Sequence, residues 1–218
     1  MHAAISARPR AAGGAWADDF SAYPVAAGLP AGWTNRYTAP AYSIESNAAA
    51  IGGRWLYING YSAGNVLKAW SMDAAGALVN ADVLAAVRVT AEGFYSVGVI
   101  ARGGGGIGTQ TGYAAALGAS DTVLLSRLEP GKDPQTIAST AFAHAASSTV
   151  YLRLNVDGTS LKVRAWPATA AEPASWLIEA SDVMYAAAGW VGGVQRYNWG
   201  QPRMDYFAVN TAGAAPLP

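Results

Sequence analysis

The 218-residue chain contains no cysteine and only two histidines. Without cysteine it has no disulfide, thiolate zinc site, iron–sulfur ligation or thiol nucleophile, and two histidines cannot supply three imidazoles to a zinc ion. No H-E-x-x-H pattern and no calcium loop of the EF-hand kind occurs in the sequence. We therefore expect no cofactor and no metal site built from side chains, while a structural calcium ion held by loop carbonyls stays open.

Charge is also scarce. Charged residues make up 13% of the chain, against about 25% in a typical soluble protein, and 14 basic and 14 acidic side chains balance to zero. Nucleic-acid binding needs a basic excess, so we expect no such partner. Weak self-repulsion favours a surface partly covered by other subunits, although a genome that favours alanine and glycine would give the same composition.

Long apolar runs are missing as well. No stretch approaches the ~20 apolar residues of a membrane span, and the N-terminus lacks the apolar run of a secretory signal. We therefore expect no membrane insertion and synthesis in the cytoplasm.

What the chain does contain is short runs of β-branched and aromatic residues, alternating with period two and interrupted by Gly, Pro, Asn and Asp. This pattern predicts about fourteen strands and no long amphipathic helix, which is typical of an all-β sandwich, jelly roll or barrel. We interpret residues 15–210 as a single β-sandwich domain. The flanking residues 1–14 and 211–218 are rich in Ala, Gly and Pro, so we interpret them as a flexible arm and a tail.

The clearest strand pair is "VYLRLNVDGTSLKVRAW", in which two alternating runs flank Asp157-Gly158. Asp-Gly at this place is the strongest short hairpin signal, and each strand has one apolar face and one polar and aromatic face. We expect an antiparallel sheet with one face on the core and the other in water. The expected wet face carries four candidates for contact with a glycan or partner: Tyr151, Arg153, Arg164 and Trp166.

Aromatic residues supply further candidates, because the chain has 8 Trp and 11 Tyr but only 4 Phe. Trp and Tyr combine a flat apolar body with a polar group, which suits sugar rings and wet interfaces, although a given Trp is more often a core residue. The additional candidates for contact are Tyr61, Tyr197 and Trp199, which are aromatic residues in expected loops, and Arg102 and Tyr113, which flank the glycine-rich residues 103–108.

Two motifs resemble catalytic or cofactor signatures. Residues 60–64 match G-x-S-x-G, the nucleophile elbow of serine hydrolases, but Ser62 would need a base within a parallel sheet, and the strands downstream read as antiparallel. We interpret 55–58 and 66–70 as antiparallel strands, with 60–64 as the turn between them. Residues 103–108 match G-x-G-x-x-G, but a strand rather than a helix follows, so we predict a hairpin loop.

Carboxylates give no glycosidase signature. Glu45, Glu92, Glu129, Glu172 and Glu179 all lack a second carboxylate two residues away, so no strand displays the paired acids that glycoside hydrolysis requires. We therefore expect no catalytic residues and no enzymatic activity.

The order and rhythm of the strands resemble the concanavalin A-like lectin/glucanase superfamily, especially its laminin-G-like and phage-associated members. The resemblance rests on "DDFSAYPVAAGLPAGWTNRY", "FYSVGVIARG", "TGYAAAL", "AAGWVGGV" and "MDYFAV", besides the hairpin quoted above. It implies a two-sheet antiparallel jelly-roll β-sandwich whose opening Asp19-Phe20 strand pairs with the closing strand 205–209. The enzymes of this superfamily carry a Glu-x-Asp-x-x-Glu strand that nothing here matches, so their catalytic residues are not carried over.

Three functional hypotheses follow. The first is a non-catalytic bacteriophage virion protein on the tail or capsid surface, made in the host cytoplasm, homo-oligomeric, in contact with other virion proteins and with host glycan. The alternative is a stand-alone bacterial carbohydrate-binding module. The third is a glycan hydrolase or lyase with unrecognised catalytic residues.

Overall fold

The computed structural model describes residues 14–37, 41–59, 67–88, 96–118, 121–196 and 201–218. Within these ranges the chain forms 17 strands and one short 3-10 helix, η2 (Asp73–Ala75). No helix in the described ranges has the length and apolarity needed to cross a membrane.

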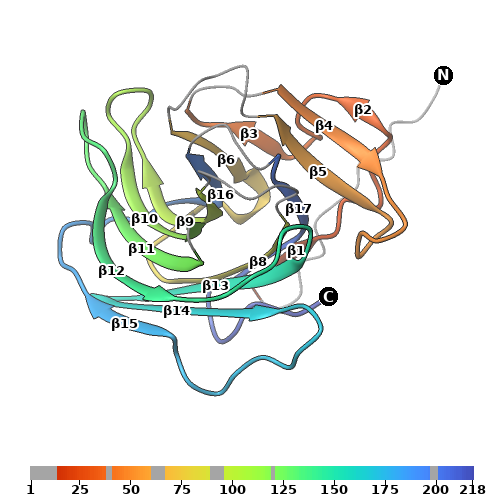
Figure 1. The fold of residues 1–218 in the computed structure, drawn as a ribbon. Coiled ribbons are helices and arrows are strands. Elements are labelled where there is room, and N and C mark those ends of the chain that lie inside the picture. Colours follow the sequence, from red (N-terminus) through yellow and green to blue (C-terminus); the bar gives the residue numbers. More distant parts are fainter. Residues whose placement is uncertain (1–13, 38–40, 60–66, 89–95, 119–120, 197–200) are drawn as a thin grey trace.

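The strands form two antiparallel sheets that face each other (Figure 1). The larger sheet contains, in spatial order, β15 (Ile178–Ser181), β14 (Ser160–Pro167), β13 (Thr149–Asp157), β8 (Ala81–Arg88), β17 (Arg203–Asn210), β5 (Arg54–Asn59), β4 (Ala41–Ser46) and β2 (Ala26–Ala27), with β1 (Ala15–Asp18) also paired to β17. The smaller sheet contains β12 (Gln135–Ala141), β11 (Thr122–Leu128), β10 (Thr111–Gly118), β9 (Ser96–Gly104), β16 (Gly189–Arg196), β6 (Lys68–Met72) and β3 (Trp33–Asn35), with β7 (Ala77–Leu78) beside β16. The prediction of a two-sheet antiparallel β-sandwich is confirmed.

Alternation along each strand decides which side chains fill the space between the sheets. On β10, Tyr113, Ala115 and Leu117 belong to the main core, whereas Ala114 belongs to a separate cluster on the outer face of the smaller sheet. The larger sheet has a corresponding outer cluster that includes Trp166. Both sheets therefore bury apolar side chains on their outer faces as well as between them.

The predicted hairpin at Asp157-Gly158 is confirmed. Strands β13 and β14 pair in register from Val150 with Pro167 to Asp157 with Ser160, and Gly158 has a φ of 56°. The glycine-rich residues 103–108 likewise end β9 and connect it to its hairpin partner β10, as predicted.

The predicted pairing of 55–58 with 66–70 is wrong. Both segments contribute strands, but β5 lies in the larger sheet and β6 in the smaller one. The connection between them crosses from one sheet to the other, which short-range alternation cannot distinguish from a hairpin. The predicted turn at 60–64, with Ser62 and Tyr61, lies outside the described residues.

The opening strand pairs with the closing strand, one residue earlier than expected. β1 ends at Asp18, which is opposite Phe207, so the Asp19-Phe20 pair falls just beyond the strand. The Asp18 carboxylate accepts hydrogen bonds from the Tyr23 hydroxyl at 2.7 Å and the Trp33 indole N–H at 2.8 Å.

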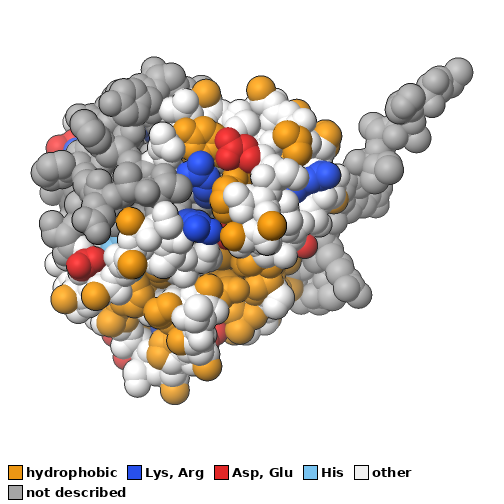
Figure 2. Space-filling view, turned by 45° about the vertical axis from the view of Figure 1, so that its right-hand side comes forward, with side chains coloured by type: hydrophobic (Ala, Val, Ile, Leu, Met, Phe, Trp, Pro, Cys, Tyr) orange, Lys and Arg blue, Asp and Glu red, His pale blue; other side chains and the backbone are white. Residues whose placement is uncertain are grey.

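The segment after β17 packs against the outer face of the larger sheet. Ala215 is buried, its N–H donates to Asp82 at 2.8 Å, and the Tyr206 hydroxyl donates to the carbonyl of Pro216 at 3.0 Å. These contacts bind the tail to the domain. Figure 2 shows another face of the molecule, where hydrophobic side chains cover a broad area, with basic and acidic side chains above it and further acidic ones at the edges.

Candidate functional site

The outer face of the smaller sheet carries an apolar cluster that joins two depressions. Its buried members are Tyr37, Ala69, Ile100, Ala114, Leu128 and Val194, with Leu67 and Trp190 packed against them. Trp190 lines one depression, and Leu67, Ala114, Leu128 and Val194 line the other. We name them the tryptophan hollow and the arginine groove.

Tyr37 is a buried member of this cluster and contacts β9, β10 and Trp190. Its hydroxyl lies within hydrogen-bond distance of the carbonyl oxygens of Gly104 (2.9 Å) and Thr111 (3.2 Å). Its ring meets the indole of Trp190 edge-on, with 5.5 Å between the ring centroids. Burial raises the pKa of Tyr37 far above its ordinary value, so the hydroxyl stays protonated and able to donate.

The tryptophan hollow has a volume of about 550 Å³, within the range of ligand pockets. It is lined by Thr34, Arg36, Met72, Asp73, Gly76, Ala77, Gly103, Ala188, Gly189 and Trp190. Asp73 accepts hydrogen bonds from the Thr34 hydroxyl at 2.7 Å and the Arg36 guanidinium at 3.3 Å. The side chains of Arg36 and Asp73 keep 35% and 39% of their surface exposed, so both can also contact a ligand.

The position of Trp190 depends on a glycine. A Cβ atom on Gly103 would lie 2.5 Å from two atoms of the Trp190 indole, so the ring lies flat against the glycine backbone. The guanidinium carbon of Arg36 is 5.9 Å from the indole centroid. Trp190 is half-buried, which leaves part of the ring available to a ligand. An aromatic plane beside a guanidinium and a carboxylate is suited to packing on an apolar ring face and hydrogen bonding to hydroxyl groups.

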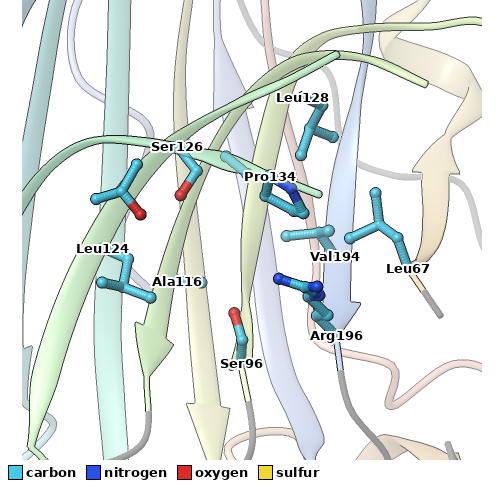
Figure 3. A pocket seen from close by; sticks show the side chains of 11 residues that line it. Leu67, Ser96, Ala116, Leu124, Ser126, Leu128, Pro134, Val194 and Arg196 are labelled. Carbon is cyan, nitrogen blue, oxygen red and sulfur yellow. The ribbon is translucent and has the colours of Figure 1, made fainter. Parts of the chain in front are cut away.

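The arginine groove consists of two adjoining depressions of about 180 Å³ and 290 Å³ that share Leu67, Leu128, Pro134 and Arg196. The other lining residues are Ser96, Ala114, Ala116, Leu124, Ser126, Thr136 and Val194 in the first, and Ile107, Gly108, Gln110, Glu129, Lys132 and Asp133 in the second. Figure 3 shows Arg196 reaching from β16 toward the side chains of Val194 and Pro134, with Ser96 beside it.

The charges along the groove are paired. Arg196 binds Asp133 at 2.6 Å, and Glu129 binds Lys132 at 2.7 Å and Arg127 at 2.6 Å. Hydrogen bonds from Lys132 and then from Arg127 hold the pKa of Glu129 below its ordinary value. Glu129 is therefore an anion at neutral pH. Among the described residues, no group of three or more His, Cys, Asp or Glu side chains is arranged to hold a metal ion.

Two sequence-predicted candidates, Arg102 and Tyr113, lie inside the protein. The Arg102 guanidinium donates to the carbonyl oxygens of Val79 at 2.6 Å and Tyr185 at 2.5 Å, and its side chain is buried. The Tyr113 hydroxyl donates to Asp182 at 2.7 Å, and burial raises the pKa of Tyr113 to about 12. In this structure both side chains anchor loops beside the smaller sheet.

The candidates Tyr151, Arg153, Arg164 and Trp166 share the outer face of the larger sheet, as alternation predicts. The expectation that this face is wet is wrong at Arg153 and Trp166, which are only 1% and 3% exposed. Ala215 of the C-terminal tail clusters with Trp166 and accepts a hydrogen bond from Arg153, which also donates to Glu172. That these four residues contact a glycan or partner stays a prediction.

Ion pairs explain how this face buries its arginines. Arg153 binds Asp82 at 2.5 Å and Glu172 at 2.9 Å. Arg164 also binds Glu172, at 2.7 Å, and its guanidinium carbon lies 3.9 Å from the ring centroid of Trp176. Arg153 and Arg164 therefore both have a carboxylate partner from another segment.

The remaining candidates, Tyr61, Tyr197 and Trp199, lie outside the described residues. Sequence reasoning missed Arg36, Trp190 and Arg196. A signal existed for the last two, because alternation along β16 places them on the outer face together with Val194.

The comparisons with known proteins concern the fold. No protein-family model and no curated protein sequence matches the chain. Among solved structures, the carbohydrate-binding module CBM66 from Bacillus subtilis is 14% identical, with a TM-score of 0.53, over 84% of this chain and 93% of that one. The exoplasmic/lumenal domain of VIP36, in a form bound to Ca²⁺ and Man3GlcNAc, is 10% identical with a TM-score of 0.55, and covers 86% of each chain. A GH16 protein of the Bacteroides ovatus mixed-linkage glucan locus, in complex with a G4G4G3G product, is 8% identical with a TM-score of 0.60, over 89% of this chain and 99% of that one.

The fold is the concanavalin A-like jelly roll. The expectation drawn from the sequence resemblance is therefore confirmed for the architecture. Within this jelly roll, the hollow and the groove both lie on the outer face of the smaller sheet.

Proposed function

We propose that this protein is a non-catalytic, lectin-like glycan-binding protein that holds a sugar in the tryptophan hollow. The observation that carries the proposal is the half-buried Trp190 ring beside the exposed Arg36–Asp73 pair. Two proteins with a similar fold support it, since one is a carbohydrate-binding module and the other has been seen with a bound mannose-containing glycan.

The chemistry of the hollow fits a pyranose. The apolar face of a sugar ring packs on the indole, while its hydroxyl groups donate to Asp73 and accept from Arg36. Because Asp73 is already oriented by Thr34 and Ser71, at 2.7 Å and 3.1 Å, little side-chain entropy is lost on binding.

The test is glycan-array binding followed by titration calorimetry with a glycan that binds. Trp190→Ala should weaken binding by about tenfold or more, since a central aromatic contact contributes roughly 1.4 kcal/mol or more. Trp176→Ala is the matched control, because Trp176 is another half-buried tryptophan next to an arginine but lies in the connection between β14 and β15, beside the larger sheet. Equal losses in both variants, or no binding to any glycan on the array, would contradict the proposal.

Catalysis has its own test. Asp73, Glu129 and Asp133 are the carboxylates that line the hollow and the groove within the described residues, and each is paired with an arginine or lysine. Turnover of a polysaccharide that disappears in Asp73→Asn would overturn the non-catalytic assignment in favour of a hydrolase or lyase.

We also propose, as a second candidate function, that the protein is a structural component on the surface of a bacteriophage particle. In this role it is made in the host cytoplasm and forms a homo-oligomer. The low charge of the chain, 13% of residues with zero net charge, supports it because a weakly self-repelling surface favours association. Sedimentation of the purified protein as a fixed oligomer without glycan binding would favour this role. A monomer that binds glycan would favour the stand-alone binding module.

A further inference from the structure

The hollow and the groove are joined along a single strand. Trp190, Val194 and Arg196 all point outward from β16, and the apolar cluster around Tyr37 fills the space between the two depressions. Six residues of extended strand span about 20 Å, so a ligand that contacts both Trp190 and Arg196 must be an extended chain rather than one small ring. An oligosaccharide has that shape.

The base of the groove is apolar and its wall offers hydroxyl groups. Ala114 and Ala116 have side chains of a single methyl group, so a flat ring can approach the sheet closely between Leu124 and Val194. Ser96, Ser126 and Thr136 line the same depression, and their hydroxyls can donate or accept. Figure 3 shows Ser96 and Ser126 on its wall. A pyranose has the matching combination of an apolar ring face and a polar rim.

Arg196, which lines both depressions of the groove, pairs with a carboxylate that can be exchanged. Arg196 and Asp133 are 2.6 Å apart, but the Asp133 side chain is 82% exposed whereas that of Arg196 is only 22% exposed. An exposed ion pair contributes about 0–1 kcal/mol, so a carboxylate delivered by a bound ligand can replace Asp133 at little cost. The planar guanidinium accepts a carboxylate in a two-pronged hydrogen-bonding geometry.

Charge balance favours a carboxylate over a phosphate. A ligand carboxylate that displaces Asp133 brings the same single negative charge to Arg196. A phosphate monoester carries nearly two negative charges at neutral pH and would lie close to the anionic Glu129. We propose that the arginine groove is a subsite for a uronic acid residue, with Asp133 occupying the carboxylate position until the glycan arrives. This inference rests on the proposed glycan-binding function and names its ligand class as an acidic polysaccharide.

The experiment compares oligogalacturonate and oligomannuronate with their neutral methyl esters by titration calorimetry on the full chain. The wild type should bind at least one acid about tenfold or more tighter than its ester, because a hydrogen-bonded charge pair is lost on esterification. Arg196→Gln should abolish that preference, because it lowers affinity for the acid far more than affinity for the ester. Asp133→Asn should raise affinity for the acid a few-fold, because it removes the competing carboxylate.

Two controls keep the outcomes separate. Glu179→Gln neutralises another exposed carboxylate, which pairs with Lys162 on the opposite sheet, and should leave both affinities unchanged. Asp133→Asn keeps the inference testable if Arg196→Gln fails to fold. Equal affinity for acid and ester, an unchanged preference in Arg196→Gln, or stronger binding of a phosphorylated oligosaccharide would overturn the subsite. If the subsite is overturned but binding of neutral glycans still requires Trp190, the proposed glycan-binding function stands. If the wild type binds no glycan at all, both the subsite and the proposed function are refuted.

Discussion

Asp205 is a buried carboxylate whose ionisation we expect to destabilise the fold at neutral pH. It lies on β17 at the point where the register with β8 shifts, between Met204 and Tyr206, and its side chain is fully buried. The Thr149 hydroxyl is 3.4 Å from one carboxylate oxygen, and the other oxygen has no hydrogen-bond partner among the described residues.

Burial raises the pKa of Asp205 from 3.8 to about 6, although Arg88, the Thr149 hydroxyl and Arg203 act in the opposite direction. In the native state the carboxyl therefore keeps its proton up to a pH of about 6, whereas in the unfolded chain it loses it near 3.8. Because the native state binds more protons in this window, the free energy of unfolding decreases as the pH rises through it, and the full penalty is present above the native pKa. A shift of about 2 pH units corresponds to about 3 kcal/mol.

Asp205→Asn removes the ionisable group and keeps the shape of the side chain. We subtract the free energy of unfolding of the wild type from that of the variant at each pH. This difference should be about 2–3 kcal/mol larger at about pH 7.5 than at about pH 4. Urea denaturation at both pH values measures this, with Glu179→Gln, whose side chain is 59% exposed, as the control. The reasoning is refuted if the stability difference between Asp205→Asn and the wild type is the same at both pH values.

Three further predictions concern the buried ion pair, the tail and the glycine under the indole. Arg153→Met should destabilise the fold by about 3–5 kcal/mol, measured by urea denaturation, because it leaves the buried Asp82 without its charged partner. Deletion of residues 212–218 should cost about 1–3 kcal/mol and speed amide exchange at the outer face of the larger sheet, because hydrogen bonds to the tail are lost. Gly103→Ala should displace Trp190, change the tryptophan fluorescence and reduce glycan affinity while the far-ultraviolet circular dichroism is preserved, because the new Cβ collides with the indole.

Local patterns predicted the strands better than their partners. The hairpin around Asp157-Gly158 could be predicted because its turn and both strands are contiguous, so sequence distance and spatial distance agree. The pairing of 55–58 with 66–70 could not, because consecutive strands of a sandwich can either pair or cross to the opposite sheet with the same alternation. The choice between these depends on how both sheets close around one core, which no short stretch encodes.

The same limit applies to the candidate site. Alternation correctly placed Tyr151, Arg153 and Trp166 on one outer face, but it carries no information about what covers that face. Part of the cover comes from residues 211–218, whose alanine- and proline-rich sequence predicts a tail outside the domain. Small residues of this kind also permit close packing across a sheet, so composition alone cannot separate the two.

The arginines of the two outer faces differ in how costly it is to exchange their partners. Arg153 is 1% exposed and its partner Asp82 is 4% exposed, so separating them would leave two charges in a poorly solvated place. Arg36 and Arg196 pair instead with Asp73 and Asp133, whose side chains are 39% and 82% exposed, and water readily takes over when such a pair opens. A ligand can therefore compete for Arg36 and Arg196 but not for Arg153. In a chain with so few charges, this difference in partner exposure is the physical reason to look for glycan on the smaller sheet.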